Sequence, residues 1–250
     1  MDDREFLENY DPAQYDRPSV TIDLVLMSIL NGSPAILLTR RAQQPFSGRW
    51  ALPGGFLQMH ESLDEAARRI LQEDTQIADA YVEQLYTFGA PDRDLRMRVL
   101  TVAYFALLPA KHFEAALKDN PALTLAEIEV PWPGETGGPV AALDSDCTPL
   151  PLAFDHAEIL GLAIKRLRGK LDYSPVAFAL LPSLFTLRQL QDVHESILGV
   201  KLNKPAFRRK MLDRNWISGS GKRETGASFR PAELYYFNQD NERNDHGTDT

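Results

Sequence analysis

Several features that mark other classes of protein are scarce in this chain of 250 residues. A single cysteine, Cys147, excludes both an internal disulfide and a metal cage of thiolate ligands. The most apolar stretches, 22–30 and 176–185, are interrupted by serine or proline and fall short of the roughly 20 residues that span a bilayer. No charged and then apolar leader precedes the acidic start of the chain. We therefore expect a protein of the reducing cytoplasm with no membrane partner.

Basic side chains are also in the minority, with 27 lysines and arginines against 35 aspartates and glutamates and a formal charge of −8. Averaged over the chain, that charge argues against nucleic acid as a partner. The average hides two opposed regions, because residues 1–164 hold 12 basic and 25 acidic side chains whereas residues 165–237 hold 14 and 6. Such asymmetry favours an acidic domain joined to a basic one.

The acidic region combines strand patterns with one clear helix. Four stretches rich in Val, Ile and Leu predict strands: 19–30, 35–39, 82–88 and 97–108. The turn residues Asn31-Gly32-Ser33-Pro34 join the first two strands into a hairpin. Residues 62–75 follow helical spacing, and Ser62 with Glu65 forms a capping box at their start. The alternation predicts an α/β sandwich, followed at 109–153 by a proline-rich and largely irregular stretch.

A long spaced pattern runs from a glycine pair into that helix. It reads Gly55, five residues, Glu61, seven residues, Arg69, and then Ile70-Leu71-Gln72-Glu73-Asp74-Thr75-Gln76-Ile77. Over all 23 positions this resembles the Nudix box, whose pattern is Gly, five residues, Glu, seven residues and Arg-Glu-aliphatic-any-Glu-Glu-any-Gly-aliphatic. The resemblance implies a Nudix α/β/α sandwich with a mixed sheet. In that family, helix carboxylates hold a divalent metal on the pyrophosphate of a nucleoside diphosphate derivative.

The pattern departs from the family at the positions that would carry chemistry. The resemblance places Mg²⁺ ligands at positions 70, 73 and 74, and the first of these is Ile70. Isoleucine cannot bind a metal, and Asp74 is one methylene shorter than the expected glutamate, so Glu73 and Asp74 remain only weak metal candidates. We therefore predict a ligand-binding Nudix fold that has no catalytic residues and requires no metal. The plain alternative is that Glu61, Arg69 and Glu73 form a solvated helix face.

Arginines complete the predicted ligand site. Arg93 and Arg96 come just before the last strand pattern and Arg98 lies at its start, in a segment that resembles the corresponding one in ADP-ribose pyrophosphatases. Arginine suits bidentate contacts with phosphate, although in an exposed turn these side chains would instead pair with Asp92 and Asp94. The predicted ligand-binding residues are Arg49, Gly54, Gly55, Glu61, Arg69, Glu73, Asp74, Arg93 and Arg96.

The basic region has the pattern of a winged helix-turn-helix. A helix that begins with a capping box at Thr186 ends at Gly199, and a second helix, about 204–214, follows a short turn. The polar loop 218–226 then leads into a strand-like stretch, 228–237. A basic second helix can enter a major groove while the loop contacts phosphate or the minor groove. The predicted DNA-binding residues are Lys204, Arg208, Arg209, Lys210, Lys222, Arg223 and Arg230.

These patterns divide the chain into four parts. Residues 1–153 form the Nudix-like ligand-sensing domain, and 183–237 form the winged helix-turn-helix. Residues 154–182 connect them through a helix and an aromatic, proline-containing segment that we expect to pack between the domains. The tail, 238–250, has no aliphatic or aromatic side chain and is expected to be disordered.

The two domains in this order resemble the Nudix-related transcriptional regulators, the NrtR family, over almost the whole ordered chain. Five short stretches also carry the resemblance: Tyr10-Asp11-Pro12, Arg17-Pro18-Ser19-Val20-Thr21, Leu152-Ala153-Phe154-Asp155-His156-Ala157, Tyr173-Ser174-Pro175-Val176-Ala177-Phe178 and Phe207-Arg208-Arg209-Lys210. The family implies a homodimeric bacterial repressor of genes for NAD biosynthesis or salvage. Such a repressor leaves its double-stranded DNA operator when ADP-ribose or a related nucleotide binds. Some relatives govern pentose metabolism, so regulation of sugar utilisation stays open as an alternative.

Two rival functions come from other classes. One is an active Mg²⁺-dependent ADP-ribose pyrophosphatase whose C-terminal domain only dimerises or docks it, and Ile70 is the residue that argues against it. The other is a ligand sensor that acts on a protein partner and uses the basic face of its small helical domain for dimerisation. That sensor would not be retained on DNA at moderate salt.

Overall fold

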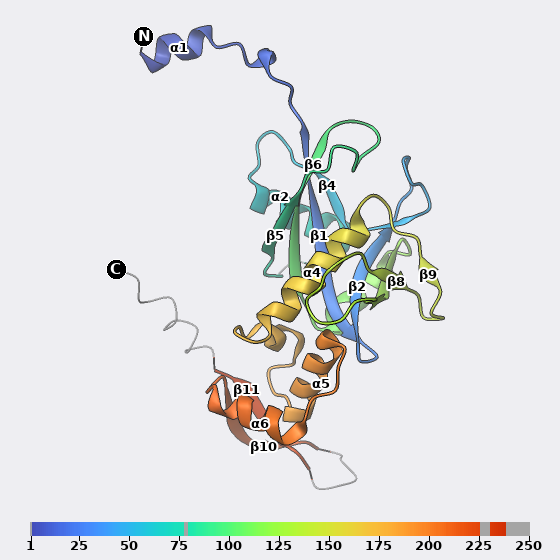
Figure 1. Cartoon of the computed structure of the whole chain (residues 1–250), viewed down its shortest axis with the longest axis vertical. Coiled ribbons are helices and arrows are strands. Elements are labelled where there is room, and N and C mark those ends of the chain that lie inside the picture. Colours follow the sequence, from blue (N-terminus) through green and yellow to red (C-terminus); the bar gives the residue numbers. More distant parts are fainter. Residues whose placement is uncertain (1, 78–79, 226–230, 239–250) are drawn as a thin grey trace.

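The structure is a computed structural model that describes residues 2–77, 80–225 and 231–238 (Figure 1). Within these residues, nine strands form the larger sheet, in the order β5-β6-β1-β2-β7-β8-β9, with β3 paired to β2 and β4 paired to β1. The strands are β1 Ser19–Leu30, β2 Ser33–Arg40, β3 Trp50–Ala51, β4 Gly54–Phe56, β5 Glu83–Phe88, β6 Val99–Leu107, β7 Leu123–Glu129, β8 Ala141–Leu143 and β9 Pro149–Leu150.

The long strand β1 lies at the centre of this sheet. It runs parallel to β6 from Ser19 to Met27 and antiparallel to β2, so the sheet is mixed as predicted. The hairpin between β1 and β2 turns on Asn31 and Gly32 alone, both with positive φ (53° and 83°), which is the requirement of a tight two-residue turn. The other two predicted turn residues belong to β2.

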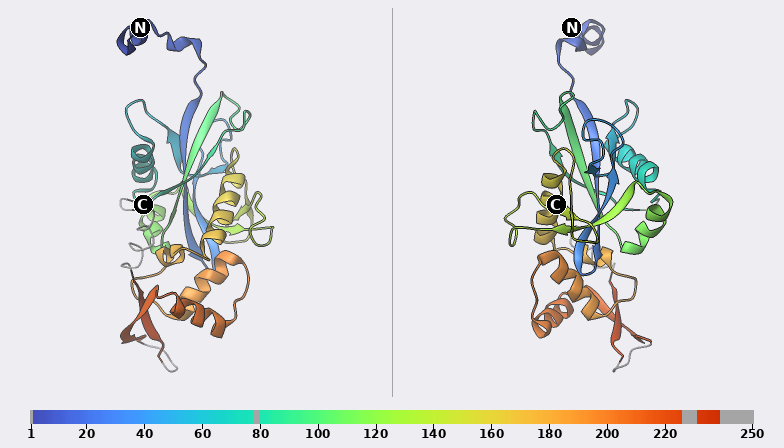
Figure 2. Two further views of the ribbon diagram at one scale, coloured as in Figure 1. Left: turned by 60° about the vertical axis from the view of Figure 1, so that its left-hand side comes forward. Right: turned by 90° about the vertical axis from the view of Figure 1, so that its right-hand side faces the viewer.

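Helices cover both faces of the sheet (Figure 2). On one face, α2 (Leu63–Thr75) and the short α3 (Glu114–Asp119) lie over Ile22, Leu24 and Leu26, while α4 (His156–Lys170) packs on the other face over Val25 and Met27. The period-2 alternation of β1 therefore feeds two separate cores. The predicted α/β/α sandwich is confirmed.

Both ends of helix α2 are fixed by hydrogen bonds between residues that are close in the sequence. The predicted capping box is present, with Ser62 and Glu65 each satisfying a backbone N–H of the other. At the opposite end Gln76 adopts the left-handed conformation (φ 57°), and its N–H donates to the carbonyl of Gln72. The family pattern has glycine at this position, and glutamine here reproduces the same helix ending.

The stretch 109–153 is more regular than predicted. It contains a 3-10 turn (η2, Ala110–Phe113), α3 and the strands β7, β8 and β9. Prolines flank β7, at Pro121 and Pro131, and leave its interior free to pair with β2. A count of prolines overstated the irregularity of this stretch because it ignored their positions.

The C-terminal part is a winged helix-turn-helix, as predicted. Its elements are α5 Leu187–Leu198, α6 Lys204–Asp213, β10 Ile217–Arg223 and β11 Glu233–Phe237. Gly199 ends α5 with a φ of 71°, and Phe207 and Met211 of α6 are buried. Strand β10 extends into the stretch that we expected to be a polar loop. Of the predicted disordered tail, 238–250, Asn238 is described and its N–H donates to the Trp216 carbonyl at 2.9 Å, while residues from 239 onward lie outside the described residues.

One hydrophobic core runs from the α4 face of the sheet into the winged helix. Between the two, η3 (Val176–Leu180) buries Ala177 and Phe178, and the Phe178 ring stacks on Phe237 with a centroid distance of 4.6 Å. The aromatic connector therefore packs between the domains, as its composition predicted.

The N-terminal residues extend away from the sheet (Figure 1). They comprise α1 (Asp3–Asn9) and the 3-10 turn η1 (Pro12–Gln14), and neither element has a buried residue. Among the described residues, no helix is long and apolar enough to cross a membrane.

Candidate functional sites

Arg69 organises the loop of the Nudix-like box. Its guanidinium donates to both carboxylate oxygens of Glu61 (2.9 and 2.7 Å), to the carbonyl of Phe56 (3.1 Å) and to Glu73 (3.1 Å). The hydrogen bonds from Arg69, joined by the Gln58 N–H, lower the pKa of Glu61 to about 2. These predicted ligand residues thus satisfy one another and brace the loop that leads into α2.

The glycine pair and Asp74 hold the other end of this loop. The Gly54 N–H donates to Asp74 Oδ2 at 3.2 Å, and burial raises the pKa of that carboxyl group. A Cβ atom at position 54 would lie 2.6 Å from both Asp23 Oδ1 and the carbonyl oxygen of Ile22. Only glycine fits this close approach of β4 to β1. Gly55 has more room, since a Cβ there would lie 3.6 Å from Ile70.

The residues of the box do not fit the magnesium site that a complete Nudix box implies. Ile70 is 2% exposed and packs in the core between α2 and the sheet. Glu73 pairs with Arg69, and Asp74 accepts the Gly54 N–H. Nowhere in the described ranges do three or more His, Cys, Asp or Glu side chains gather as metal ligands do.

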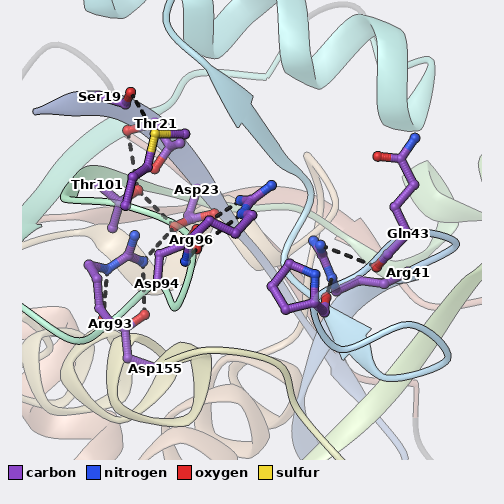
Figure 3. A network of polar contacts seen from close by, with 12 residues as sticks. Ser19, Thr21, Asp23, Arg41, Gln43, Arg93, Asp94, Arg96, Thr101 and Asp155 are labelled. Atoms are coloured by element: carbon purple, nitrogen blue, oxygen red, sulfur yellow. Dashed lines mark hydrogen bonds and ion pairs between the residues drawn. The ribbon is translucent and has the colours of Figure 1, made fainter.

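A buried polar network lies on the α4 face of the sheet (Figure 3). Arg93 donates twice to the Asp155 carboxylate (2.9 and 2.8 Å) and once, at 3.4 Å, to Asp23, which also accepts from Thr101 at 2.7 Å. The Arg93 side chain is only 4% exposed. This arginine, predicted to contact ligand, ties the loop before β6 to Asp155, the N-cap residue just before α4. Sequence reasoning missed both of its partners.

His156 extends this network as a neutral residue. Burial lowers the pKa of its imidazole, and the Leu52 N–H donates to its Nδ1 at 2.9 Å. Because Nδ1 accepts, the proton of the neutral ring is on Nε2, which faces Asp23 Oδ1 at 3.7 Å. The network therefore has a fixed arrangement of donors and acceptors.

Beside the network, three arginines and three phenylalanine rings form what we name the arginine–aromatic cluster. Arg96 lies over Phe56 (5.7 Å), Arg49 over Phe46 (5.2 Å) and Arg41 over Phe154 (4.7 Å), and the rings of Phe46 and Phe154 meet edge to face at 5.0 Å. Each guanidinium also has polar contacts: Arg96 with Asp94, Arg49 with the Leu152 carbonyl, and Arg41 with the carbonyls of Gln43 and Pro45.

The positive charges of this cluster favour the binding of an anion. Burial and then repulsion from Arg96 lower the pKa of Arg41, so the two positive charges are close enough to interact. Arg96 keeps 40% of its side chain exposed although Asp94 pairs with it. Among the predicted residues, Arg49 and Arg96 belong to this cluster. Arg41 was missed, and its only sequence signal is a basic pair, Arg40-Arg41, at the end of a strand.

The basic surface of the C-terminal part is mostly exposed. Lys204, Arg208 and Arg209 are exposed on α6, and Lys222 and Arg223 are exposed on β10. Lys210 is different, since it pairs at 2.8 Å with Asp172 just after α4 and lowers the pKa of that carboxyl group. Arg230 lies outside the described residues.

A compact polar network fixes the turn between α5 and α6. Glu195 accepts hydrogen bonds from Lys201 (2.7 Å), from the Leu202 N–H (3.0 Å) and from Gln191 (2.7 Å). These bonds lower the pKa of Glu195 to about 2. Asn203 then caps α6 by accepting from the Ala206 N–H at 3.0 Å. The angle at which α6 is presented is set by this network, which the sequence did not reveal.

Comparison with known proteins assigns both domains. Residues 21–132 match the NUDIX domain, and residues 177–237 match the NrtR DNA-binding winged helix domain. The chain is 35% identical over 237 residues to the ADPR responsive transcriptional repressor NtrR of Acinetobacter baylyi, covering 94% of this chain and 88% of that protein. The chain belongs to the NrtR family.

Solved structures support the NrtR assignment over the same length. NrtR of Shewanella oneidensis complexed with a 27mer DNA is 34% identical, with a TM-score of 0.73 over 88% of this chain and 94% of that one. A MutT/nudix family protein from Enterococcus faecalis is 28% identical, with a TM-score of 0.73 over 95% of this chain and 94% of that one. The predicted family and the order of its two domains are confirmed.

Proposed function

We propose that this NrtR-family chain is a DNA-binding transcriptional repressor of NAD-metabolism genes and that ADP-ribose, bound by its Nudix domain, releases it from DNA. One observation carries the proposal: a Nudix domain with an incomplete metal site shares a core with a winged helix whose basic residues are exposed. The relatives agree, because one is an ADPR responsive repressor and another was solved with DNA. Such a protein works where the DNA lies, in the cytoplasm of a bacterium.

The arginine–aromatic cluster supports the choice of ligand. ADP-ribose carries a pyrophosphate between two ribose units and ends in an adenine ring. Arg41, Arg49 and Arg96 supply fork-shaped donors for the pyrophosphate, and the phenylalanine rings supply apolar faces for adenine. The other predicted ligand residues contribute by shaping the loop around the site: Gly54, Gly55, Glu61, Arg69, Glu73 and Asp74.

The winged helix supports a particular mode of DNA binding. Lys204, Arg208 and Arg209 on α6 are the candidates for the major groove, and Lys222 and Arg223 are candidates for phosphate contacts by the wing. One winged helix reads only a few base pairs. We therefore expect a homodimer that reads two half-sites about one helical turn apart.

A mobility-shift titration tests this function. The probe is the duplex upstream of the chain's own gene, with and without ADP-ribose at saturating concentration. We expect retention at moderate salt and weaker retention with ADP-ribose. An unchanged affinity would remove the induction model, and no retention at all would favour a sensor that acts on a protein partner.

We also propose that the chain does not hydrolyse ADP-ribose. Ile70 is buried where the family places a metal-ligand glutamate, and both remaining carboxylates already accept other hydrogen bonds. Incubation with ADP-ribose and Mg²⁺ should release no AMP, while calorimetry of the same sample shows that ADP-ribose binds. Robust turnover would sink this claim, and appearance of turnover in Ile70→Glu would strengthen it.

A further inference from the structure

Helix α4 is attached at its two ends to the two functional parts of the molecule. Near its start, Asp155 and His156 belong to the buried network beside the arginine–aromatic cluster. Near its end, Arg168 reaches the winged helix. The helix has 15 residues, which corresponds to a length of about 22 Å. A single rigid element therefore bridges the ligand side and the DNA side.

The attachment at the start of α4 consists of two ion pairs made by arginines of one loop. Arg93 grips Asp155 through two hydrogen bonds of 2.9 and 2.8 Å, in the bidentate geometry that resists rotation. Three residues further on, Arg96 donates two hydrogen bonds to the Asp94 carboxylate (Figure 3), and Arg96 also lies over the Phe56 ring of the cluster. A shift of the cluster's arginine can thus be transmitted along one short loop to Asp155, the N-cap residue of α4.

The attachment near the end of α4 is a buried arginine that binds carbonyl groups. Arg168 donates to the carbonyl of Ile197 on α5 (2.8 Å) and to those of Gly134 (2.7 Å) and Trp132 (3.3 Å), and its guanidinium lies 4.9 Å from the Trp132 ring. It is 6% exposed. In the part of the chain that the structure describes, burial lowers the pKa of Arg168 and no nearby carboxylate counters this effect. The Arg168 guanidinium thus connects α4, α5 and the loop that contains Trp132 and Gly134. An apolar residue of similar size could not make these hydrogen bonds.

The body of α4 packs closely against the loop beside it. Gly161 lets this loop lie directly on the helix, since a Cβ atom there would lie 1.8 Å from the Gly138 carbonyl oxygen. The Val140 N–H donates to the Ala157 carbonyl, and the apolar side of α4 is buried against the sheet. Packed helices of this kind shift as rigid bodies by about 1–2 Å rather than bend.

We propose that α4 is the lever through which the bound nucleotide repositions the winged helix, with Asp155 and Arg168 as the positioning residues at its two attachments. This inference rests on the proposed function and specifies its regulation. An anion drawn in by Arg41 and Arg96 moves the loop that holds Arg93, the Arg93–Asp155 pair moves α4, and Arg168 moves α5. In a dimer, the same shift changes the spacing of the two α6 helices.

Two conservative variants test the lever, one at each end. Asp155→Asn keeps the side-chain volume but weakens the pair with Arg93, and Arg168→Lys keeps the charge but loses the fork. Exposed residues of the same helix provide matched controls, Glu158→Gln and Arg166→Lys. For each protein, calorimetry gives the Kd for ADP-ribose, and fluorescence anisotropy gives the Kd for the upstream duplex with and without ADP-ribose.

The coupling ratio, the duplex Kd with ADP-ribose over the Kd without it, decides the outcome. We expect a ratio of about 5 or more for the wild type and the controls, and below about 2 for both lever variants, with each separate Kd within about threefold of wild type. A wild-type ratio of one would overturn the proposed function and the lever together. Wild-type coupling that persists in both lever variants would overturn the lever alone. So would loss of either separate binding activity, because the residues would then build a site rather than connect two.

Discussion

The two domains hold their charged residues in opposite ways. In the Nudix domain Arg69, Arg93 and Arg96 each pair with a carboxylate, and the Arg93 side chain is 4% exposed. On the winged helix, by contrast, most basic side chains are exposed to solvent. A small anion needs preorganised donors whose positions are fixed before it arrives. A DNA backbone offers many phosphates, so exposed cations that act at a distance suffice.

The largest expected effect comes from breaking the buried pairs of the Nudix domain. Arg93→Met leaves Asp23 and Asp155 buried without their cation, which should lower the free energy of unfolding by about 3–5 kcal/mol. Urea titration followed by circular dichroism measures this. Arg98→Met, in the same loop but exposed, is the control and should cost less than about 0.5 kcal/mol. Equal effects of the two changes would mean that the pairing contributes nothing.

The exposed surface of α6 should respond in binding and not in stability. Arg208→Ala combined with Arg209→Ala should weaken DNA binding by at least about 30-fold, because each arginine that contacts a base contributes about 1–3 kcal/mol and the two together contribute about 2 kcal/mol or more. The Kd for ADP-ribose and the unfolding midpoint should stay near wild type. Anisotropy titrations at two salt concentrations check this, and a collapse of stability would contradict the contrast between the domains.

The dependence of stability on acidic pH tests one carboxylate in each domain that is kept ionised by its hydrogen-bond partners. Glu61 and Glu195 both have a pKa of about 2 in the folded protein, held there by Arg69 and Lys201 respectively. Since these values lie below the ordinary value of 4.5, their stabilisation is complete above about pH 5 and is lost as the pH falls toward 2. The free energy of unfolding, measured across this pH window, should fall less steeply in Glu61→Gln and in Glu195→Gln than in the wild type.

Salt sharpens this comparison between the two carboxylates. The Lys201 side chain is 87% exposed and that of Arg69 is 24% exposed. We therefore expect 0.5 M salt to weaken the Glu195 contribution more than the Glu61 contribution. The reverse order would show that exposure does not govern these pairs.

The smallest expected effect concerns the one basic residue of α6 that resembles the Nudix arginines. Asp172→Asn releases Lys210 from its ion pair and should tighten DNA binding by no more than about fivefold, as an exposed pair is worth at most about 1 kcal/mol. Asp213→Asn removes the same charge from the end of α6 and is the control. If both variants tighten binding equally, general charge and not the release of Lys210 is responsible.

The sequence predicted the fold well where local rules dominate. Capping boxes at Ser62 and Thr186, the Asn31-Gly32 turn and the apolar stripe of α6 all depend on residues a few positions apart. The ligand side was less predictable because its partners are distant. Arg93 and Asp155 are 62 residues apart, and no periodicity connects them. The cluster likewise brings together loops that follow different strands, so Arg41 could be assigned only after folding.

The core shared by the two domains also determines how the protein unfolds. Phe178 and Phe185 pack with Phe237 and with the α4 side of the sheet in one apolar cluster, so neither domain can unfold without uncovering the other. Heating should therefore produce a single calorimetric transition rather than two, with equal van't Hoff and calorimetric enthalpies. A winged helix separated from the rest of the chain at residue 183 would expose this apolar surface to solvent. We therefore expect the sensor and the DNA-binding part to unfold as one cooperative unit.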